Sequence, residues 1–363
     1  MNATAKLRAA GQSLWLDDIT RELLDSGTLQ NYIEQLSVTG LTSNPSIFDH
    51  AITHSEKYDD EIRRLTARGY SDEALFFELA LEDLERAADL FRPVHDATAG
   101  TDGWVSLEVS PLLAHQTDET IGEARRLWRR ADKENLFIKI PGTKEGLPAI
   151  EQSIAAGVPV NVTLLFSPRQ YEAAADAYMR GLERRIAAGL APNVRSVASV
   201  FISRWDRAVA DKVPAEMRNT LGAAIGKLSY KSYRDLLDSD RWQRLMNYGA
   251  APQRLLFAST SMRDPKAPDA FYVDTLAAPN TINTTPAGTL KAFADHGNAG
   301  GVLQRDGGDG AATIAAHAKA GIDIDALADQ LQSDGAEAFV ASWKDLLRAI
   351  DTKSRALGVQ KAA

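Results

Sequence analysis

Eight short β-like segments alternate with longer helical patterns along most of this chain. They span residues 13–17, 38–44, 104–110, 136–141, 158–166, 196–203, 254–259 and 281–285. Strands that alternate with helices pair in parallel through right-handed crossovers, and eight such units are the number that closes a barrel. The spacing therefore predicts an α/β fold, a (β/α)8 TIM barrel.

Helical patterns beyond the eight units predict additions to the barrel. Two helical insertions are expected, at about 50–100 and 205–250, because apolar residues recur at helical spacing within Asp72 to Phe91 and within Glu216 to Asp238. Barrels often exceed 250 residues, so the 363 residues are expected to form one α/β-barrel catalytic domain, 1–363.

A C-terminal helical tail is expected at about 325–358. Its pattern predicts two helices, Asp325 to Leu331 and Ala336 to Leu357, with Asp325 as the N-cap of the first. The second has Phe339 and Trp343 on one apolar stripe. The tail is expected to pack across the wall or rim of the barrel.

The composition excludes several classes of partner. The net charge of −8 and the absence of a long basic run argue against nucleic acid. Without cysteine there is no disulfide and no thiolate metal site, and His50 and His54, the only histidines at helical spacing, favour a solvated face over a metal site. No apolar signal region and no run of 18 apolar residues occurs, so no membrane partner and a cytoplasmic location are expected.

One charged side chain, Lys139, lies within an apolar segment. Residues 135–143 are Asn-Leu-Phe-Ile-Lys-Ile-Pro-Gly-Thr, which is typical of a buried strand that ends at a loop, where a barrel displays its chemistry. Burial disfavours the ammonium form, and a neutral amine can attack a carbonyl carbon and form a Schiff base. The structural alternative is a lysine whose stem covers apolar surface while its head reaches water.

Polar residues at the ends of other predicted strands surround the same expected cavity. They are Asp17, Asp18, Thr42, Asn44, Glu108, Asn161 and Thr163. Each has an ordinary alternative role in a helix cap, a turn or a structural ion pair. Lysine-based carbonyl chemistry needs a proton shuttle and a base. Glu108 with a water on Thr163 would provide the shuttle, and Asp17 would provide the base. Ser199, Arg204 and Arg263 follow at the sixth and seventh strands, where barrels commonly bind phosphate.

Two segments resemble the signature sequences of the transaldolase family. They are 40–48, Gly-Leu-Thr-Ser-Asn-Pro-Ser-Ile-Phe, and 135–143. Segments 15–21, 106–110, 161–167, 198–204 and 257–264 also fall in the order of that family. The length and the Trp15-Leu-Asp-Asp-Ile opening are most similar to the longer bacterial subfamily.

The resemblance implies a reaction and a role for each matching residue. Sedoheptulose 7-phosphate and glyceraldehyde 3-phosphate would give erythrose 4-phosphate and fructose 6-phosphate, by transfer of a dihydroxyacetone unit in the non-oxidative pentose phosphate pathway. Lys139 matches the Schiff-base lysine, Asp17 the base at the cleaved bond, and Glu108 with Thr163 the acid and its water. The implied substrate-binding residues are Thr42, Asn44 and Asn161, with Ser199, Arg204, Arg263 and Ser261 at the phosphate. The family uses no metal and no organic cofactor, and sugar phosphates are the expected partners.

Three questions stay open at this stage. The register of the first strand decides whether Asp17 or Asp18 faces the cavity. A fructose 6-phosphate aldolase that releases free dihydroxyacetone, or a noncatalytic sugar-phosphate-binding barrel, would use similar residues. The oligomeric state is monomer or homodimer.

Overall fold

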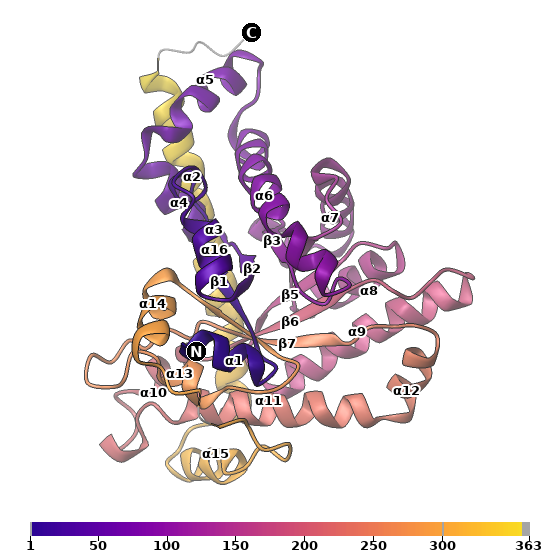
Figure 1. The fold of residues 1–363 in the computed structure, drawn as a ribbon, viewed down its shortest axis with the longest axis vertical. Coiled ribbons are helices and arrows are strands. Elements are labelled where there is room, and N and C mark those ends of the chain that lie inside the picture. Colours follow the sequence, from indigo (N-terminus) through magenta and orange to yellow (C-terminus); the bar gives the residue numbers. More distant parts are fainter. Residues whose placement is uncertain (1, 300, 358–363) are drawn as a thin grey trace.

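Eight parallel strands close into a barrel in the computed structural model, which describes residues 2–299 and 301–357 (Figure 1). Each strand pairs with the next along the chain, and β8 pairs with β1. The strands are β1 (Ser13–Asp17), β2 (Val38–Thr42), β3 (Trp104–Glu108), β4 (Leu136–Pro141), β5 (Val160–Leu165), β6 (Ser196–Phe201), β7 (Gln253–Ala258) and β8 (Ile282–Thr285). Each predicted segment contains most of one observed strand, so the predicted (β/α)8 fold is confirmed.

Aromatic side chains fill the barrel near the N-terminal ends of the strands. The ring centroids of Trp104 and Phe137 are 4.1 Å apart, and those of Trp15 and Phe137 are 6.3 Å apart. Gly40 leaves room for this layer, because a Cβ at that position would lie 2.5 Å from the Trp15 ring. The layer separates the N-terminal mouth of the barrel from the cavity at its other end.

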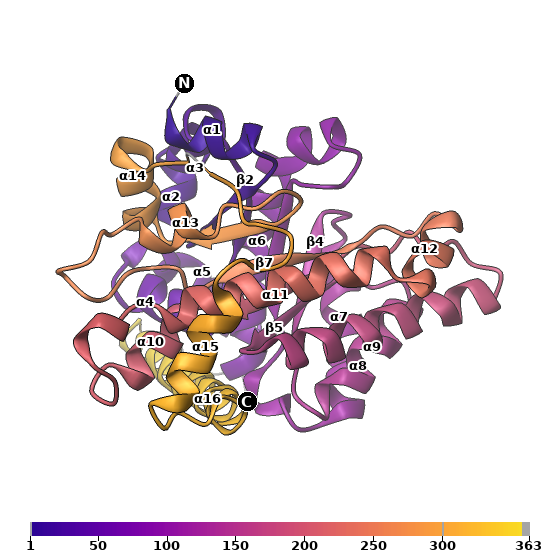
Figure 2. The ribbon, with the colours of Figure 1, turned by 90° about the horizontal axis from the view of Figure 1, so that it is seen from below.

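Helices cover the outside of the barrel, and Figure 2 shows α8, α9, α11 and α12 along one flank. Those outside the insertions and before the C-terminal tail are α1 (Ala3–Ala9), α2 (Arg21–Asp25), α3 (Thr28–Gln35), η2 (Pro111–Leu113), α7 (Thr117–Ala131), α8 (Gly146–Ala155), α9 (Pro168–Ala187), α13 (Phe271–Thr275), α14 (Ala287–His296) and α15 (Gly310–Lys319). Within the described part of the chain, no helix combines the length and the apolar character needed to cross a membrane.

Both predicted helical insertions are present. Between β2 and β3 lie α4 (Pro45–Thr53), η1 (Glu56–Tyr58), α5 (Asp59–Ala67) and α6 (Asp72–Ala97). Between β6 and β7 lie α10 (Ser203–Val209), η3 (Ala215–Met217), α11 (Leu221–Asp238) and α12 (Asp240–Asn247). In Figure 1, α5 and α6 extend away from the barrel beside one end of α16 (Ile324–Ala356), with which both are in contact.

The C-terminal tail is one continuous helix, α16, so the prediction of two helices was wrong. Gly335 lies at the predicted break, but the helix continues through it, and the glycine packs so closely that an added Cβ would lie 3.0 Å from Leu164 and 3.1 Å from Arg204. Asp323, and not the predicted Asp325, caps the helix, since its side chain accepts a hydrogen bond from the Ala326 amide. The helix does cross the barrel rim, and the last residue of the predicted tail, 358, lies outside the described residues.

Candidate active site

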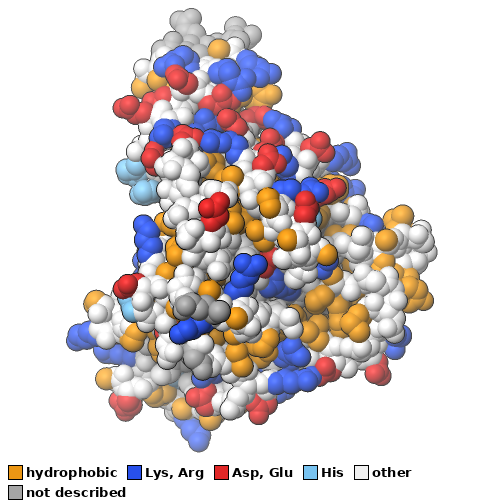
Figure 3. Space-filling model, viewed as in Figure 1, with side chains coloured by type: hydrophobic (Ala, Val, Ile, Leu, Met, Phe, Trp, Pro, Cys, Tyr) orange, Lys and Arg blue, Asp and Glu red, His pale blue; other side chains and the backbone are white. Residues whose placement is uncertain are grey.

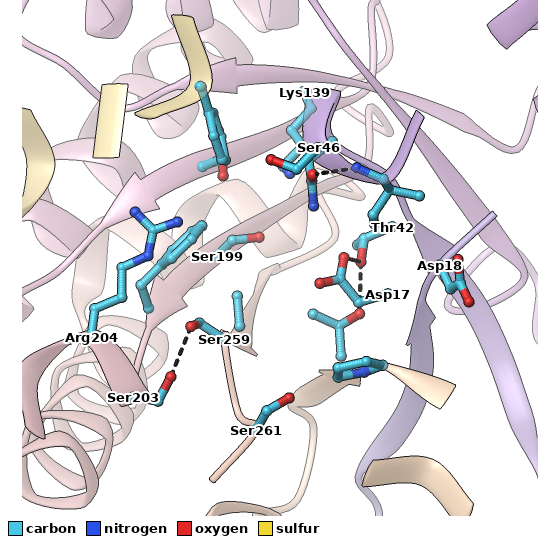
Figure 4. Close-up of a pocket in the computed structure, with 18 of the residues that line it drawn as sticks. Asp17, Asp18, Thr42, Ser46, Lys139, Ser199, Ser203, Arg204, Ser259 and Ser261 are labelled. Carbon is cyan, nitrogen blue, oxygen red and sulfur yellow. Dashed lines mark hydrogen bonds between the residues drawn. The ribbon is translucent and has the colours of Figure 1, made fainter. Parts of the chain in front are cut away.

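A cavity of about 730 Å³ opens at the C-terminal ends of the barrel strands (Figure 4). This volume is in the range of ~300–1,000 Å³ that is typical of small-molecule sites. The predicted site residues that line it are Asp17, Thr42, Asn44, Lys139, Thr163, Ser199, Arg204, Ser261 and Arg263. The other two, Glu108 and Asn161, are buried behind this lining, in contact with Lys139 and Ser199 respectively.

Strand register brings three of these residues to one level inside the barrel. Glu108 on β3 is paired with Lys139 on β4, and Lys139 is paired with Asn161 on β5. Side chains alternate between the two faces of a strand, so in-register partners on neighbouring strands point the same way. An amine, a carboxyl group and an amide therefore share the interior below the cavity.

Lys139 lies at the floor of the cavity, and the residue is only 5% exposed. Its Nζ is 3.1 Å from Oε2 of Glu108, and it donates a hydrogen bond of 3.1 Å to the carbonyl oxygen of Ser43. The ring centroid of Phe339 on α16 is 5.7 Å away. The amine is thus shielded from bulk water but open to a ligand in the cavity.

Glu108 lies beside this amine, and Thr163 lines the same cavity. Burial raises the pKa of Glu108; the Lys139 charge opposes this, and the Asp17 charge adds to it. Among the described residues, Oε1 of Glu108 and Oγ1 of Thr163 have no hydrogen-bond partner. A buried polar atom without a partner is costly, so both oxygens favour a bound water or a substrate atom.

Asp17 and Asp18 both line the cavity, but their surroundings differ. Oδ1 of Asp17 accepts a hydrogen bond of 2.7 Å from Thr42, whose oxygen is also 2.7 Å from that of Thr284. Burial raises the pKa of Asp17, against the opposing charge of Lys139. The pKa of Asp18 is also raised, first by burial and then by the Asp17 charge. Figure 4 shows Asp17 beside Thr42 and Asp18 farther from Lys139.

The two amide residues of the prediction serve the fold as well. Oδ1 of Asn44 accepts from the Ile47 amide and caps α4, while the residue lines the cavity. Asn161 is fully buried and holds Ser106 and Ser199, at 3.1 and 2.8 Å. Asn161 does not line the cavity itself; it is linked to the cavity through its hydrogen bond with Ser199.

The other side of the cavity carries positive charge. Figure 4 shows Arg204 across the cavity from Asp17, with Ser199 between them and Ser261 below. Burial lowers the pKa of Arg204, and within the described residues its guanidinium forms no ion pair. Its Cζ lies 4.9 Å from the Phe201 ring centroid and 5.9 Å from that of Phe339. Arg263 is exposed on the loop after β7 and lines the same cavity.

Several lining residues were missed by the sequence analysis. Ser203 and Ser259, whose hydroxyls are 2.9 Å apart, follow β6 and β7, so their position at strand ends was a usable signal. The others include Ser46, Ile47 and His50 of α4, Phe201 of β6, Thr284 and Pro286 at β8, and Phe339 of α16. Those from α4 follow directly after β2, whereas Phe339 of α16 reaches the cavity only through packing between distant parts of the chain.

Metal ligands are not grouped in the described residues: no three or more His, Cys, Asp or Glu side chains gather there as a metal site requires. His50 and His54 stack with their ring centroids 4.5 Å apart.

Comparisons with known proteins find similar sequences over nearly the whole chain. The family model described as Transaldolase/Fructose-6-phosphate aldolase matches residues 14–350. A transaldolase of Acidothermus cellulolyticus is 46% identical over 354 residues, covering 95% of both chains. One of Thermobifida fusca is 44% identical over 351 residues, covering 94% of this chain and 95% of the relative. A protein named Transaldolase 2 from Nostoc punctiforme is 40% identical over 377 residues and covers 98% of each chain.

Proposed function

The chain belongs to the transaldolase/fructose-6-phosphate aldolase family, and we propose that it is a transaldolase that carries a dihydroxyacetone unit on Lys139. The observation that carries the proposal is the buried Lys139–Glu108 contact of 3.1 Å at the floor of a cavity open to solvent. The relatives at 40–46% identity are named transaldolases, which supports transfer over simple cleavage. Sedoheptulose 7-phosphate or fructose 6-phosphate is the proposed donor.

Schiff-base formation is the first step. The Lys139 amine attacks the C2 carbonyl carbon of the ketose and gives up its proton as the C–N bond forms, and the carbinolamine then loses its oxygen as water. Glu108 supplies the proton for that departure through a water on Thr163, since the raised pKa of Glu108 keeps it protonated at higher pH than an exposed glutamate. The partnerless oxygens of Glu108 and Thr163 support this pairing.

Cleavage of the C3–C4 bond follows. Asp17 takes the proton of the C4 hydroxyl, the bond electrons move toward the iminium nitrogen, and an aldose phosphate leaves. The three-carbon enamine stays on Lys139 until glyceraldehyde 3-phosphate or erythrose 4-phosphate accepts it. The placement of Asp17 and Arg204 across the cavity from one another supports this orientation, with the reacting hydroxyl at Asp17 and the phosphate at Arg204.

The phosphate lies against Arg204, with Arg263 and Ser261 at the cavity edge. A guanidinium without a carboxylate partner is suited to a phosphate, which it can bind through two parallel hydrogen bonds. Ser199 is held by Asn161 at the cavity wall. Thr42 and Asn44 line the donor end near Asp17, where sugar hydroxyls would bind.

Borohydride trapping tests the proposal. With fructose 6-phosphate present, we expect reduction to fix a three-carbon or six-carbon adduct on Lys139, identified by digestion and mass mapping. Lys139→Ala should abolish the adduct, whereas Lys144→Ala, a change at the exposed lysine five residues later, should leave it intact. No adduct, or an adduct on another lysine, contradicts the mechanism and would leave a noncatalytic sugar-phosphate-binding barrel as the better reading.

Acceptor dependence separates the proposed transferase from an aldolase, because the family model covers both activities. The assay follows fructose 6-phosphate consumption with and without erythrose 4-phosphate. We expect product only with the acceptor and little free dihydroxyacetone without it. Rapid release of dihydroxyacetone in the absence of acceptor would identify an aldolase.

A further inference from the structure

A second cavity of about 380 Å³ lies at the N-terminal mouth of the barrel. Ser13, Trp104, Ser196 and Arg254, which stand at or near the starts of their strands, line it together with the loops between them. Phe137 also lines this cavity and precedes Lys139 by two residues, which is roughly 7 Å along a strand. The aromatic layer of Trp15, Trp104 and Phe137 therefore divides this cavity from the proposed active site.

The charged residues that line this second cavity are unbalanced. They are Arg8, Arg195, Arg254 and Asp102, so three positive charges and one negative charge leave a net charge of +2. Asp102 is already engaged: it accepts a hydrogen bond of 2.7 Å from the Trp15 indole and another from Ser13, and it lies 3.6 Å from Arg254. The excess positive charge has no counterion among the described lining residues.

Two of the three guanidinium groups have N–H donors that form no hydrogen bond with a described residue. Arg254 is used by the fold, since it donates to Thr101, Ser13 and Thr281 at 2.9, 2.6 and 2.9 Å. Arg195, by contrast, donates one hydrogen bond of 2.8 Å to the Ala99 carbonyl and forms no ion pair with a described residue. Arg8, exposed on α1, makes neither a side-chain hydrogen bond nor an ion pair within the described chain.

Burial lowers the pKa of Arg195, and the charge of Arg254 lowers it further against the opposing effect of Tyr178. An anion bound beside Arg195 would offset the repulsion that Arg195 experiences from Arg254. Figure 3, in which α1 faces the viewer, shows Lys and Arg side chains gathered near the centre of this face.

We propose that this cavity is a second anion site, which binds the phosphate group of a small phosphate monoester through Arg195 and Arg8. A phosphate dianion matches the net charge of +2, whereas chloride or a monocarboxylate would leave one positive charge unbalanced. The planar forks of arginine also suit phosphate oxygens. Binding there joins α1 to the loop before β6 and is independent of the chemistry at Lys139.

Calorimetric titration of the full chain with fructose 6-phosphate, and separately with inorganic phosphate, tests the proposal. We expect two binding events for the wild-type protein. Arg195→Ala and Arg8→Glu should each weaken one event at least tenfold while the other stays within twofold, and Arg204→Ala should do the reverse. Arg129→Ala, at an exposed arginine of α7 in neither cavity, is the matched control.

The outcomes are distinguishable. One binding event that Arg204→Ala alone removes would overturn the second site, as would a second event that survives both Arg195→Ala and Arg8→Glu. Chloride and acetate at equal ionic strength should not compete; competition by either would assign the effect to general screening and reject a phosphate site. Arg8 is exposed, so its variant keeps the test valid even if Arg195→Ala fails to fold. A tight event with the sugar phosphate but not with inorganic phosphate would show that the monoester is required, and equal affinities would make the phosphate group sufficient.

Discussion

Replacing Gly335 by alanine should weaken phosphate binding more than it changes the stability of the fold. Gly335 lies inside α16, and a Cβ there would be 3.1 Å from Nη1 of Arg204 and 3.0 Å from Cδ2 of Leu164. Leu164 is fully buried and has a positive φ of 59°, so its position is tightly fixed. The Arg204 guanidinium is the end of a flexible side chain, and we therefore expect Arg204 to move.

The magnitude follows from opposing terms. Alanine is favoured over glycine in a helix by about 1 kcal/mol, while a mild overpacking costs about 1–3 kcal/mol. The two largely offset one another, so the free energy of unfolding should change by less than about 2 kcal/mol. A charge-assisted hydrogen bond contributes about 1.5–3 kcal/mol, and losing one would raise KM for fructose 6-phosphate by about tenfold or more.

Steady-state kinetics and thermal unfolding of Gly335→Ala check this expectation. The Ki of inorganic phosphate as a competitive inhibitor should rise in parallel with KM, and the bulkier Gly335→Val should exaggerate both effects. Gly122→Ala is the matched control, because Gly122 is also helical but nothing lies within 4 Å of its added Cβ. If KM and Ki stay within twofold of the wild-type values in both Gly335 variants, the reasoning that Arg204 holds the phosphate from this position is refuted.

Three further predictions concern single groups. Burial raises the pKa of Asp17, so kcat/KM should fall as pH is lowered through that raised value, and Asp17→Asn should remove this acid limb and cost about 10²–10⁴-fold in rate, measured by pH-rate profiles. Burial raises the pKa of Asp83 to about 6. The contribution of Asp83 to the free energy of unfolding is therefore complete below the unfolded pKa of about 3.9 and is lost as the pH rises through about 6. Urea melts should show this decrease in the free energy of unfolding with pH in the wild type and not in Asp83→Asn. Gln332→Ala should lower the free energy of unfolding by about 1–3 kcal/mol, because it strips hydrogen bonds from the carbonyls of Gly142 and Leu164; an unchanged urea midpoint would contradict this.

The strands and the residues on them were predictable because both depend on local periodicity. Alternation along β3 and β4 specifies which side chains face inward, so Glu108 and Lys139 were expected together before the structure placed them 3.1 Å apart. The limits of this logic show at Asn161. Strand alternation predicts that a side chain points into the barrel, but it does not predict whether that side chain reaches the cavity. Asn161 lies behind the cavity wall, where it accepts a hydrogen bond from Ser199.

The positions of the helices were predictable, but where one helix ends was less so. A sequence of Gln-Ser-Asp-Gly at 332–335 is typical of a helix end, because glycine costs about 1 kcal/mol inside a helix. In the structure the helix nevertheless continues, with Gly335 packed closely against Leu164 and Arg204. The packing partners lie about 130–170 positions away in the sequence, so no window of neighbouring residues contains them. This tertiary packing overrode the local signal for a helix end.

The contribution of α16 to the site is of the same kind. Its apolar face was visible in the sequence, but the sequence does not say what that face covers. Trp343 packs on α6, 4.8 Å from the Phe76 ring centroid, and Gln332 binds the carbonyls at the ends of β4 and β5. These two contacts set the rotation of the helix about its axis. Gly335 lies one turn from Gln332 and approaches Arg204, and Phe339 lies one turn from Trp343 and approaches Lys139. The groups proposed to bind phosphate and form the Schiff base are therefore covered by the same helix face, so a change in the seating of α16 should affect both binding and chemistry even though no residue of α16 takes part in a proposed chemical step.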